Sequence, residues 1–184
     1  MFKSKNPSAL RSQKEITEAL ITLMRDTPYD EISVKQILLE SKLAKKTFYR
    51  NFESKDDVLL SLIRGKFRDY FSVVDGGNVD VLTIIFDFAS KNKELLMILD
   101  RNDMLHVVLK CMNENLRLHK SGQVSETNPF IQLFDGLDSE YLVALNMGAI
   151  WNVIALWVHC GMKEKPEYIK ETIRQYIMRL GQVS

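Results

Sequence analysis

Residues 33–57 read SVKQILLESKLAKKTFYRNFESKDD, and this stretch decides the fold of the N-terminal part of the chain. It opens with a capping box, because the Ser33 hydroxyl can accept a hydrogen bond from the Gln36 amide while the Gln36 side chain reaches back. The capping box predicts a short helix that continues through Glu40. The chain is then expected to turn at residues 41–43.

The second short helix of this stretch is predicted to run from Ala44 to about Asn51. At about 100° per residue, Phe48 and Phe52 lie about 40° apart, so both can anchor this helix against the first one. The opposite half and its edges then carry polar side chains that face outward: Lys45, Lys46, Thr47, Tyr49 and Arg50. Two short helices with a tight turn and such an exposed face are typical of a DNA-reading helix-turn-helix at residues 33–52.

Charge is distributed unevenly along the chain, although the formal net charge is only +1. Residues 35–55 hold six basic side chains against two acidic ones, a net +4, which leaves −3 for the rest of the chain. The basic residues are Lys35, Lys42, Lys45, Lys46, Arg50 and Lys55. A local basic patch is the footprint expected for phosphate binding, and a solvated surface without a partner is the alternative that charge alone leaves open.

The remaining sequence shows helical periodicity throughout, so the predicted fold class is all-α. Asn6 and Pro7 begin the first helix, residues 27–30 break it, and Ser54 caps a longer connecting helix that runs to about Val73. These elements make a compact N-terminal unit of three helices and a connecting helix.

Asp75-Gly76-Gly77-Asn78 is the clearest internal break and marks the expected domain boundary. The sequence thus predicts a helix-turn-helix domain with its connecting helix at residues 1–74, and a helical regulatory and dimerisation domain at residues 75–184. Helices in the second domain are expected near residues 80–92, 93–100, 104–120 and 138–160, and from Pro166 to Gly181. Residues 121–128 are expected to form a loop.

Residues 138–160 carry apolar side chains on both sides of the predicted helix, so both sides need cover. One side can face its own domain and the other a second subunit, while a helix central to a monomer core is the alternative. With the helix that starts at Pro166, this pattern predicts a four-helix dimer interface. The residues assigned to it are Leu142, Leu145, Ala149, Val153, Leu156, Ile169, Ile173, Tyr176 and Ile177.

Several functional classes find no support in the residues. The histidines and cysteines lack the paired spacing of metal ligands, so we expect no metal and no cofactor. No GxSxG, Walker A, GxGxxG or HExxH motif occurs, so we do not expect an enzyme. The N-terminus has no signal-peptide stretch, polar residues interrupt the apolar segment 141–160, and no CxxC occurs. These features predict a cytoplasmic protein with no membrane span.

Residues 47–57 resemble the N-terminal signature of the TetR family. The block Thr-aromatic-Tyr-x-x-Phe is present at residues 47–52, and Ser-Lys-acid-acid follows at residues 54–57. Arg11 stands at the family's basic position early in the first helix, and the resemblance covers roughly residues 10–62.

The chain departs from the family pattern at two positions. Lys42 stands in the turn where the family usually has Gly, and Ala44 stands where a small hydroxyl residue commonly starts the recognition helix. A positive φ at Lys42 would strain the turn by about 1 kcal/mol. The missing cap at Ala44 would cost a similar amount, about 1 kcal/mol.

The resemblance implies a homodimeric transcriptional regulator, usually a repressor, that binds a palindromic double-stranded operator and is released by a small effector. It assigns base-edge contacts to Lys45 and Lys46, where lysine can donate to guanine. It assigns phosphate contacts to Ser33, Thr47, Tyr49 and Lys55, with Lys35 and Asn51 as further candidates. The alternative is a co-regulator that uses the same scaffold mainly for contacts with another protein.

An apolar effector cavity in the C-terminal part is the last sequence-based expectation. Its candidate lining residues are Phe86, Met104, Met112, Phe134 and Trp151. Ordinary core packing is the alternative for each of them. The run from Gly148 to Pro166 also resembles a C-terminal domain type found among TetR relatives of low-GC Gram-positive bacteria, which implies a regulatory domain and no particular ligand.

Overall fold

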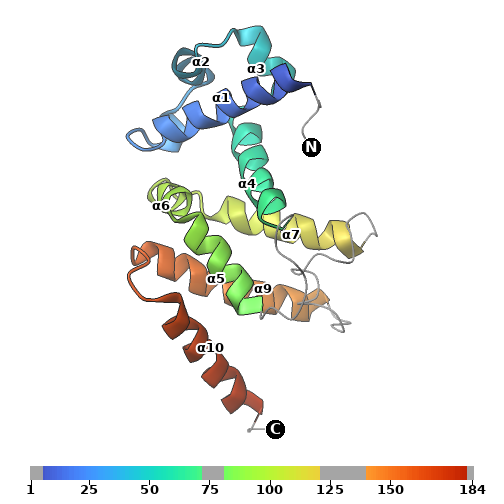
Figure 1. The fold of residues 1–184 in the computed structure, drawn as a ribbon, viewed down its shortest axis with the longest axis vertical. Coiled ribbons are helices and arrows are strands. Elements are labelled where there is room, and N and C mark those ends of the chain that lie inside the picture. Colours follow the sequence, from blue (N-terminus) through green and yellow to red (C-terminus); the bar gives the residue numbers. More distant parts are fainter. Residues whose placement is uncertain (1–5, 72–80, 121–139, 182–184) are drawn as a thin grey trace. The chain divides into compact units, whose positions relative to one another are not determined.

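The computed structural model describes residues 6–71, 81–120 and 140–181, and every regular element in these ranges is helical (Figure 1). The elements are α1 (Pro7–Leu23), the 3-10 helix η1 (Tyr29–Glu31), α2 (Val34–Ser41), α3 (Lys45–Asn51), α4 (Lys55–Phe71), α5 (Val81–Lys91), α6 (Lys93–Arg101), α7 (His106–Lys120), α9 (Glu140–His159) and α10 (Pro166–Gly181). The predicted all-α class is confirmed. α7 begins two residues later than expected, after Asp103 adopts a left-handed φ of 60°.

The chain forms two compact units. The first contains α1 to α4 together with residues 101–114, and the second contains residues 74–100 and 115–184. The boundary expected just before Asp75 lies outside the described residues.

Residues 101–114 join the first unit, whereas the sequence pattern places them in the regulatory domain. Two side chains show why. The Asn102 amide bonds to the backbone of residues 24 and 29, and Glu114 forms an ion pair with Arg64 of α4 at 2.7 Å. Because these partners lie 50 to 78 positions away, the sequence carries no local signal for them.

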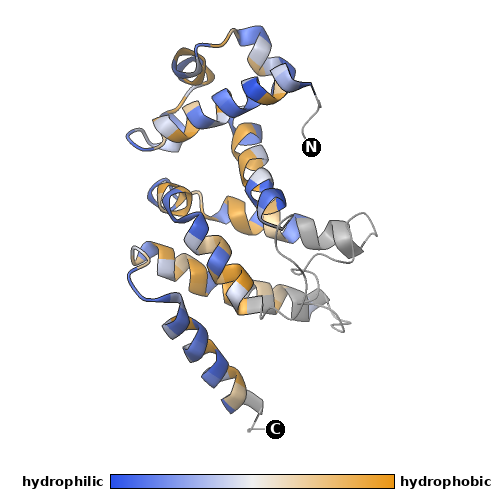
Figure 2. Ribbon diagram, in the orientation of Figure 1, coloured by the Kyte–Doolittle hydropathy of each residue, from blue (hydrophilic) through white to orange (hydrophobic). Residues whose placement is uncertain are grey.

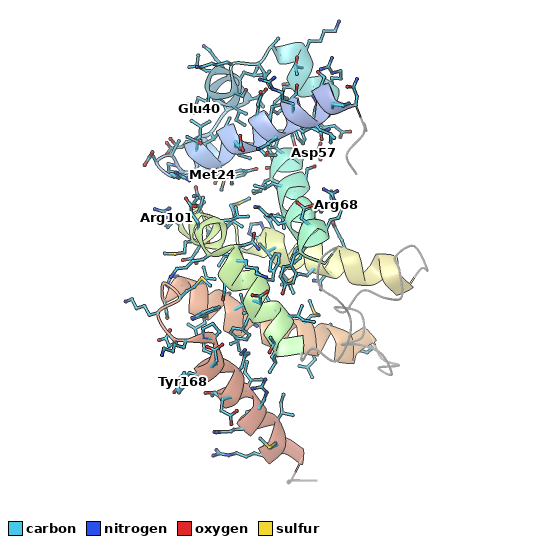
Figure 3. The ribbon with its side chains drawn as sticks, in the orientation of Figure 1. Met24, Glu40, Asp57, Arg68, Arg101 and Tyr168 are labelled. Atoms are coloured by element: carbon cyan, nitrogen blue, oxygen red, sulfur yellow. The ribbon has the colours of Figure 1, made fainter. Side chains whose placement is uncertain are left out.

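Helix α1 is the central element of the first unit and packs against α2, α3 and α4 (Figure 1). Its start is capped as expected, because the Asn6 side chain accepts a hydrogen bond from Ser8 N at 3.0 Å and Pro7 needs no partner for its nitrogen. Ile16 and Leu20, four residues apart, are fully buried. Met24 ends this apolar stripe at the C-terminal end of α1, as Figure 3 shows.

The core of the second unit is built from aromatic and aliphatic side chains of α5, α6 and α9, and Figure 2 shows α5 and α9 as strongly apolar. The rings of Phe86 and Trp157 lie 5.3 Å apart, and Trp157 Nε1 donates to the backbone oxygen of Glu164 at 3.0 Å. α9 ends at His159, two residues before the Gly161 at which the sequence predicts the helix to stop, and Gly161 has a φ of 78°. α10 then packs against α5.

The part of the chain that the structure describes holds neither a metal-binding cluster nor a membrane-spanning helix. No group of histidine, cysteine or acidic side chains there is arranged to hold a metal ion. Nor does any helix of the described ranges have the length and apolarity needed to cross a bilayer.

Candidate nucleic-acid interface

Helix α2 starts with the capping box that the sequence predicts. Ser33 Oγ accepts from Gln36 N at 3.3 Å, and Gln36 Oε1 accepts from Ser33 N at 2.8 Å. Two backbone donors of the first turn are therefore satisfied. Ile37 is fully buried beneath α1, and Ser33 and Lys35 are exposed. The two candidate contacts of α2 thus lie at the surface of the first unit.

The turn between α2 and α3 has the conformation that the two departures from the family pattern anticipate. Lys42 lies in the left-handed region, with φ 56° and ψ 29°. A lysine there is strained by its Cβ, whereas a glycine would not be. Ala44 is the N-cap of α3, and no side chain caps this helix end. Both departures therefore weaken the element that presents α3.

Helix α3 buries only two of its seven residues, Phe48 and Asn51. Phe48 is fully enclosed, its ring lies 6.1 Å from that of the buried Phe52, and the two therefore anchor the helix as expected. The outward face is polar: Lys45, Lys46, Tyr49 and Arg50 are exposed, and Thr47 is half-buried. Lys45 Nζ lies 5.9 Å from the centroid of the Tyr49 ring, within the range of a cation–π contact.

Asn51 differs from the other candidate contacts, because its side chain is only 8% exposed. Its Nδ2 donates to the Thr47 backbone oxygen at 2.8 Å, and its Oδ1 accepts from Gln13 Nε2 at 3.3 Å. The amide is thus turned into the first unit. Its partner Gln13 is 38 positions away, so the sequence carries no local signal for this pair.

Lys55 stands at the first position of α4 and is half-buried. Its ammonium group donates to the backbone oxygens of Tyr29 at 2.7 Å and Asp30 at 3.3 Å. It also lies 4.4 Å from the centroid of the Tyr29 ring. An ammonium has three donors, so one remains for a further acceptor such as a phosphate.

Tyr29 is a site residue that the sequence interpretation missed. Its ring is buried, and its hydroxyl donates to Asp56 Oδ1 at 2.5 Å. Burial of the ring is the main cause that raises the Tyr29 pKa above its ordinary value, and the hydrogen bond to Asp56 raises it further. Tyr29 therefore stays neutral and ties η1 to the first turn of α4. The only sequence signal was its place after Pro28, which indicates a turn and no partner.

Asn102 was also missed. Its Oδ1 accepts from Tyr29 N at 2.8 Å and its Nδ2 donates to the backbone oxygen of Met24 at 2.9 Å. The Asn102 amide therefore forms a hydrogen bond with one backbone group at each end of the loop between α1 and η1. Together with Lys55 and Asp56, it holds the loop and the start of α4 in place within the first unit.

The predicted dimer residues lie on α9 and α10 in the second unit. Leu145 and Leu156 of α9 are 66% and 64% exposed. Tyr176, Ile177 and Ala149 are also exposed, whereas Val153, Ile169 and Ile173 are half-buried. The Leu142 side chain lies outside the described residues. Large apolar side chains thus remain uncovered on these two helices within the single chain.

The effector-pocket candidates fall into two units. Phe86 and Trp151 are buried in the second unit, whereas Met112 is buried and Met104 half-buried in the first. Phe134 lies outside the described residues. The four described side chains are thus mostly core residues of the unit that each belongs to.

Comparison with known proteins gives the same family over most of the chain. Residues 16–62 match the family of bacterial regulatory proteins of the tetR type, and residues 79–179, more than half of the chain, match the family described as a transcriptional regulator C-terminal region. No protein among the curated sequences matches.

Two solved structures share the fold. One is a TetR transcriptional regulator from Streptococcus agalactiae 2603V, with a TM-score of 0.61 and 17% identity over 90% of this chain and 92% of that one. The other is the fatty acid degradation regulator FadR from Bacillus halodurans, with a TM-score of 0.59 and 18% identity over 94% of this chain and 95% of that one. The chain belongs to the TetR family of DNA-binding transcriptional regulators.

Proposed function

We propose that this regulator is a homodimeric repressor that binds a palindromic operator through α3 and leaves it when an effector binds the second unit. The observation that carries the proposal is the outward face of α3. It exposes Lys46 on the side away from the buried Phe48, and Lys45 and Tyr49 at the edges of that side. A short helix with a basic and hydroxyl-bearing face fits the major groove of DNA.

The exposed residues divide by the part of DNA that each can reach. Lys45 and Lys46 are the first two residues of α3. The N-terminal residues of a recognition helix contact base edges, where lysine can donate to guanine O6 and N7. Ser33, Lys35, Thr47, Tyr49 and Lys55 are proposed to contact phosphates, which position the protein without reading sequence. For Lys55, the third ammonium donor and the positive end of α4 would both favour a phosphate.

Asn51 is the weakest of these contacts. Its amide already pairs with Gln13 and Thr47, so a DNA contact would need these hydrogen bonds to open.

The uncovered apolar side chains of α9 and α10 support the dimer. Leu145 and Leu156 would lose exposed apolar surface in a four-helix interface with the same helices of a second copy, together with Tyr176 and Ile177. A two-fold axis would present two α3 helices to two operator half-sites. Rotation of the reading heads upon effector binding would then remove the match to the half-site spacing. The complex would work in the cytoplasm, where the DNA lies.

Binding-site selection tests the DNA-binding role. We expect the wild-type chain to enrich one palindromic sequence from a pool of randomised duplexes. Tyr49→Phe and Lys55→Ala should weaken binding to all duplexes, and Lys55→Ala should lower the salt slope by about 1. Lys45→Ala and Lys46→Ala should change which sequence is enriched. Lys110→Ala, which removes an exposed lysine of α7, is the control and should change neither property. Unchanged binding in all four variants would refute the proposal.

Sedimentation measures the dimer. Leu145→Glu and Leu156→Glu each place a charge on the uncovered apolar surface, so we expect them to shift the protein from dimer toward monomer and to weaken binding to the full palindrome. Lys163→Glu, an exposed position beyond α9, is the control for added negative charge. A protein that sediments as a monomer before any change would refute the interface.

The alternative role, a co-regulator that acts through another protein, draws on the strained Lys42 and the uncapped Ala44. A gel-shift with the DNA upstream of its own gene separates the two roles. Absence of specific binding at low salt, with and without cell extract, would favour the co-regulator.

A further inference from the structure

The buried polar residues of the first unit differ in what they bond to. Ser12 and Thr17 donate to carbonyls of their own helix, α1, so their hydroxyls are satisfied locally. Gln13 of α1 and Asn51 of α3 instead pair across the two helices, Nε2 to Oδ1, at 3.3 Å. Their side chains are 2% and 8% exposed. This Gln13–Asn51 pair is therefore a buried polar contact between α1 and the reading helix.

The chemistry of the acceptor settles the direction of the pair. The Thr47 backbone oxygen can only accept, so the Asn51 nitrogen must face it, at 2.8 Å. The Asn51 oxygen then faces Gln13, whose nitrogen is the group that donates. Gln13 Oε1 is buried and accepts no hydrogen bond from any of the described residues.

Such a pair is a poor device for stability. A buried amide oxygen without a donor has lost its hydration and gained nothing in return. Two apolar side chains of similar volume would fill the same space without that loss. What the pair provides and an apolar contact would not is a hydrogen bond, which fixes the relative orientation of the two helices.

Direction matters here because α3 has so few points of attachment. Of its seven residues only Phe48 and Asn51 are buried, and its N-cap Ala44 makes no side-chain hydrogen bond. Packing of Phe48, and of Phe52 just after the helix, holds α3 against the core, but apolar packing is non-directional and leaves the helix free to rotate slightly about its own axis. A hydrogen bond at Asn51, about 60° around the helix from Phe48, removes this freedom.

We propose that the Gln13–Asn51 pair orients the reading helix, so that Gln13 is a positioning residue for sequence-specific DNA binding although it lies on α1. This inference rests on the proposed function. It gives Asn51 an inward role in place of a direct DNA contact. Lys45 and Lys46 project from the same short helix as Asn51. A small rotation of α3 would therefore displace their contacts with base edges, while the basic side chains would still be attracted to phosphates.

The test combines three variants, Gln13→Met, Asn51→Leu and the double variant, with two measurements. Gln13→Met is the main one, because it leaves α3 unchanged and removes no group that could touch DNA. Folding is followed by urea denaturation. Binding is measured on a duplex selected by the wild-type protein and, for comparison, on calf-thymus DNA. Asn113→Leu, at an exposed position of α7 in the same unit, is the control for the added leucine.

We expect Asn51→Leu to lower stability, because the whole Gln13 amide is then buried without a partner, and the double variant to recover it. Gln13→Met should change stability less, because one unpaired amide oxygen, that of Asn51, replaces another, that of Gln13. Affinity for the selected duplex should fall by about tenfold in all three variants, the cost of one misplaced base contact, with no recovery in the double variant. Affinity for calf-thymus DNA should stay near the wild-type value. The fall in specificity without a fall in stability is the signature of orientation.

Three results would overturn the proposal. One is a Gln13→Met protein that binds the selected duplex as the wild type does. Another is recovery of affinity together with stability in the double variant, since the pair would then serve folding alone. The third is failure of the double variant to fold, although no amide is left unpaired in it. If the wild-type chain selects no duplex at all, the proposed function itself fails, and this is seen before any variant is made.

Discussion

The ammonium group of Lys55 donates to the backbone oxygen of Tyr29 at 2.7 Å and lies 4.4 Å from the centroid of the Tyr29 ring. The Tyr29 hydroxyl in turn donates to Asp56, the residue after Lys55. Both ends of Tyr29 are therefore bonded to the first turn of α4. A residue proposed to contact phosphate is thus also a structural support for the loop that precedes α2.

The first prediction concerns stability at alkaline pH. The pKa of Tyr29 is raised above its ordinary value of 10.0 mainly by burial and also by Asp56. The stability that this shift contributes is therefore present below about pH 10 and is lost above it, where tyrosine ionises in the unfolded chain. We expect Tyr29→Phe to be less stable than the wild type at pH 8, and this difference to shrink above pH 10. Urea denaturation at a series of pH values measures it.

The control for this experiment is Tyr168→Phe, because Tyr168 is exposed on α10. Its pH dependence should follow that of the wild type. A constant difference between Tyr29→Phe and the wild type up to pH 11 would show that the buried phenol has no part in alkaline unfolding.

The second prediction concerns Asn102. Asn102→Ala removes the acceptor of Tyr29 N and the donor to the Met24 oxygen, and so leaves two partly buried backbone groups without these partners. We expect a loss of about 1–3 kcal/mol in the free energy of unfolding. Urea denaturation checks this, with Asn113→Ala, an exposed asparagine of α7, as the matched variant. Equal stability of the two variants would contradict the role assigned to Asn102.

The third prediction concerns the strained turn before α3. Lys42 has a φ of 56°, which glycine adopts without the Cβ clash, so Lys42→Gly should raise the free energy of unfolding by about 1 kcal/mol. Lys66→Gly, in the exposed middle of α4, should instead lower it by about 1 kcal/mol. The opposite signs separate relief of strain from the general effect of a glycine. A loss of stability in both variants would contradict the interpretation.

The fourth prediction concerns the start of α3. Ala44→Ser places a hydroxyl where Ser33 has one at the start of α2. The hydroxyl can accept from Lys46 N, or share Thr47 N with the Ala44 backbone oxygen, which already accepts from Thr47 N at 2.8 Å. We expect the free energy of unfolding to rise by about 1 kcal/mol, while Ser33→Ala lowers it by about 1 kcal/mol. Both are measured by thermal and urea denaturation. No change on Ala44→Ser would mean that another group already satisfies the first turn of α3.

The fifth prediction concerns the two thiols. Cys160 is exposed, whereas Cys111 is buried in α7, and burial raises the pKa of Cys111 to about 11. Because the thiolate is the reactive form, a thiol reagent at pH 7.5 should label one cysteine quickly and the second only after unfolding. Mass spectrometry identifies the labelled residue. Rapid double labelling of the folded protein, or fast labelling in Cys160→Ser, would contradict the burial of Cys111.

Much of the first unit could be predicted from sequence because its signals are local. The Ser33–Gln36 capping box, the anchoring Phe48 and the positive φ of Lys42 all depend on residues within one or two turns of each other. The end of α9 shortly before Gly161 and the start of α10 at Pro166 were predictable for the same reason. These features agree with the structure, and the family match confirms the fold that they imply.

The contacts of Asn51, Tyr29 and Asn102 could not be predicted in this way. Asn51 lies about 60° around α3 from Phe48, which allows its burial, but its partner Gln13 is 38 positions away. The Tyr29–Asn102 bond joins residues 73 positions apart. A polar side chain in a sequence carries no mark of whether it will meet water, DNA or another amide.

By itself, the sequence determined the helical class, the helix-turn-helix at residues 33–52 and the basic face of α3, because caps, turns and apolar spacing act within a few residues. Only the tertiary structure decided that residues 101–114 belong to the first unit, that Lys55 is bonded to Tyr29 and that Asn51 faces inward. The physical reason is that a buried polar group must find its partner wherever the fold brings one, and that partner is distant in the chain.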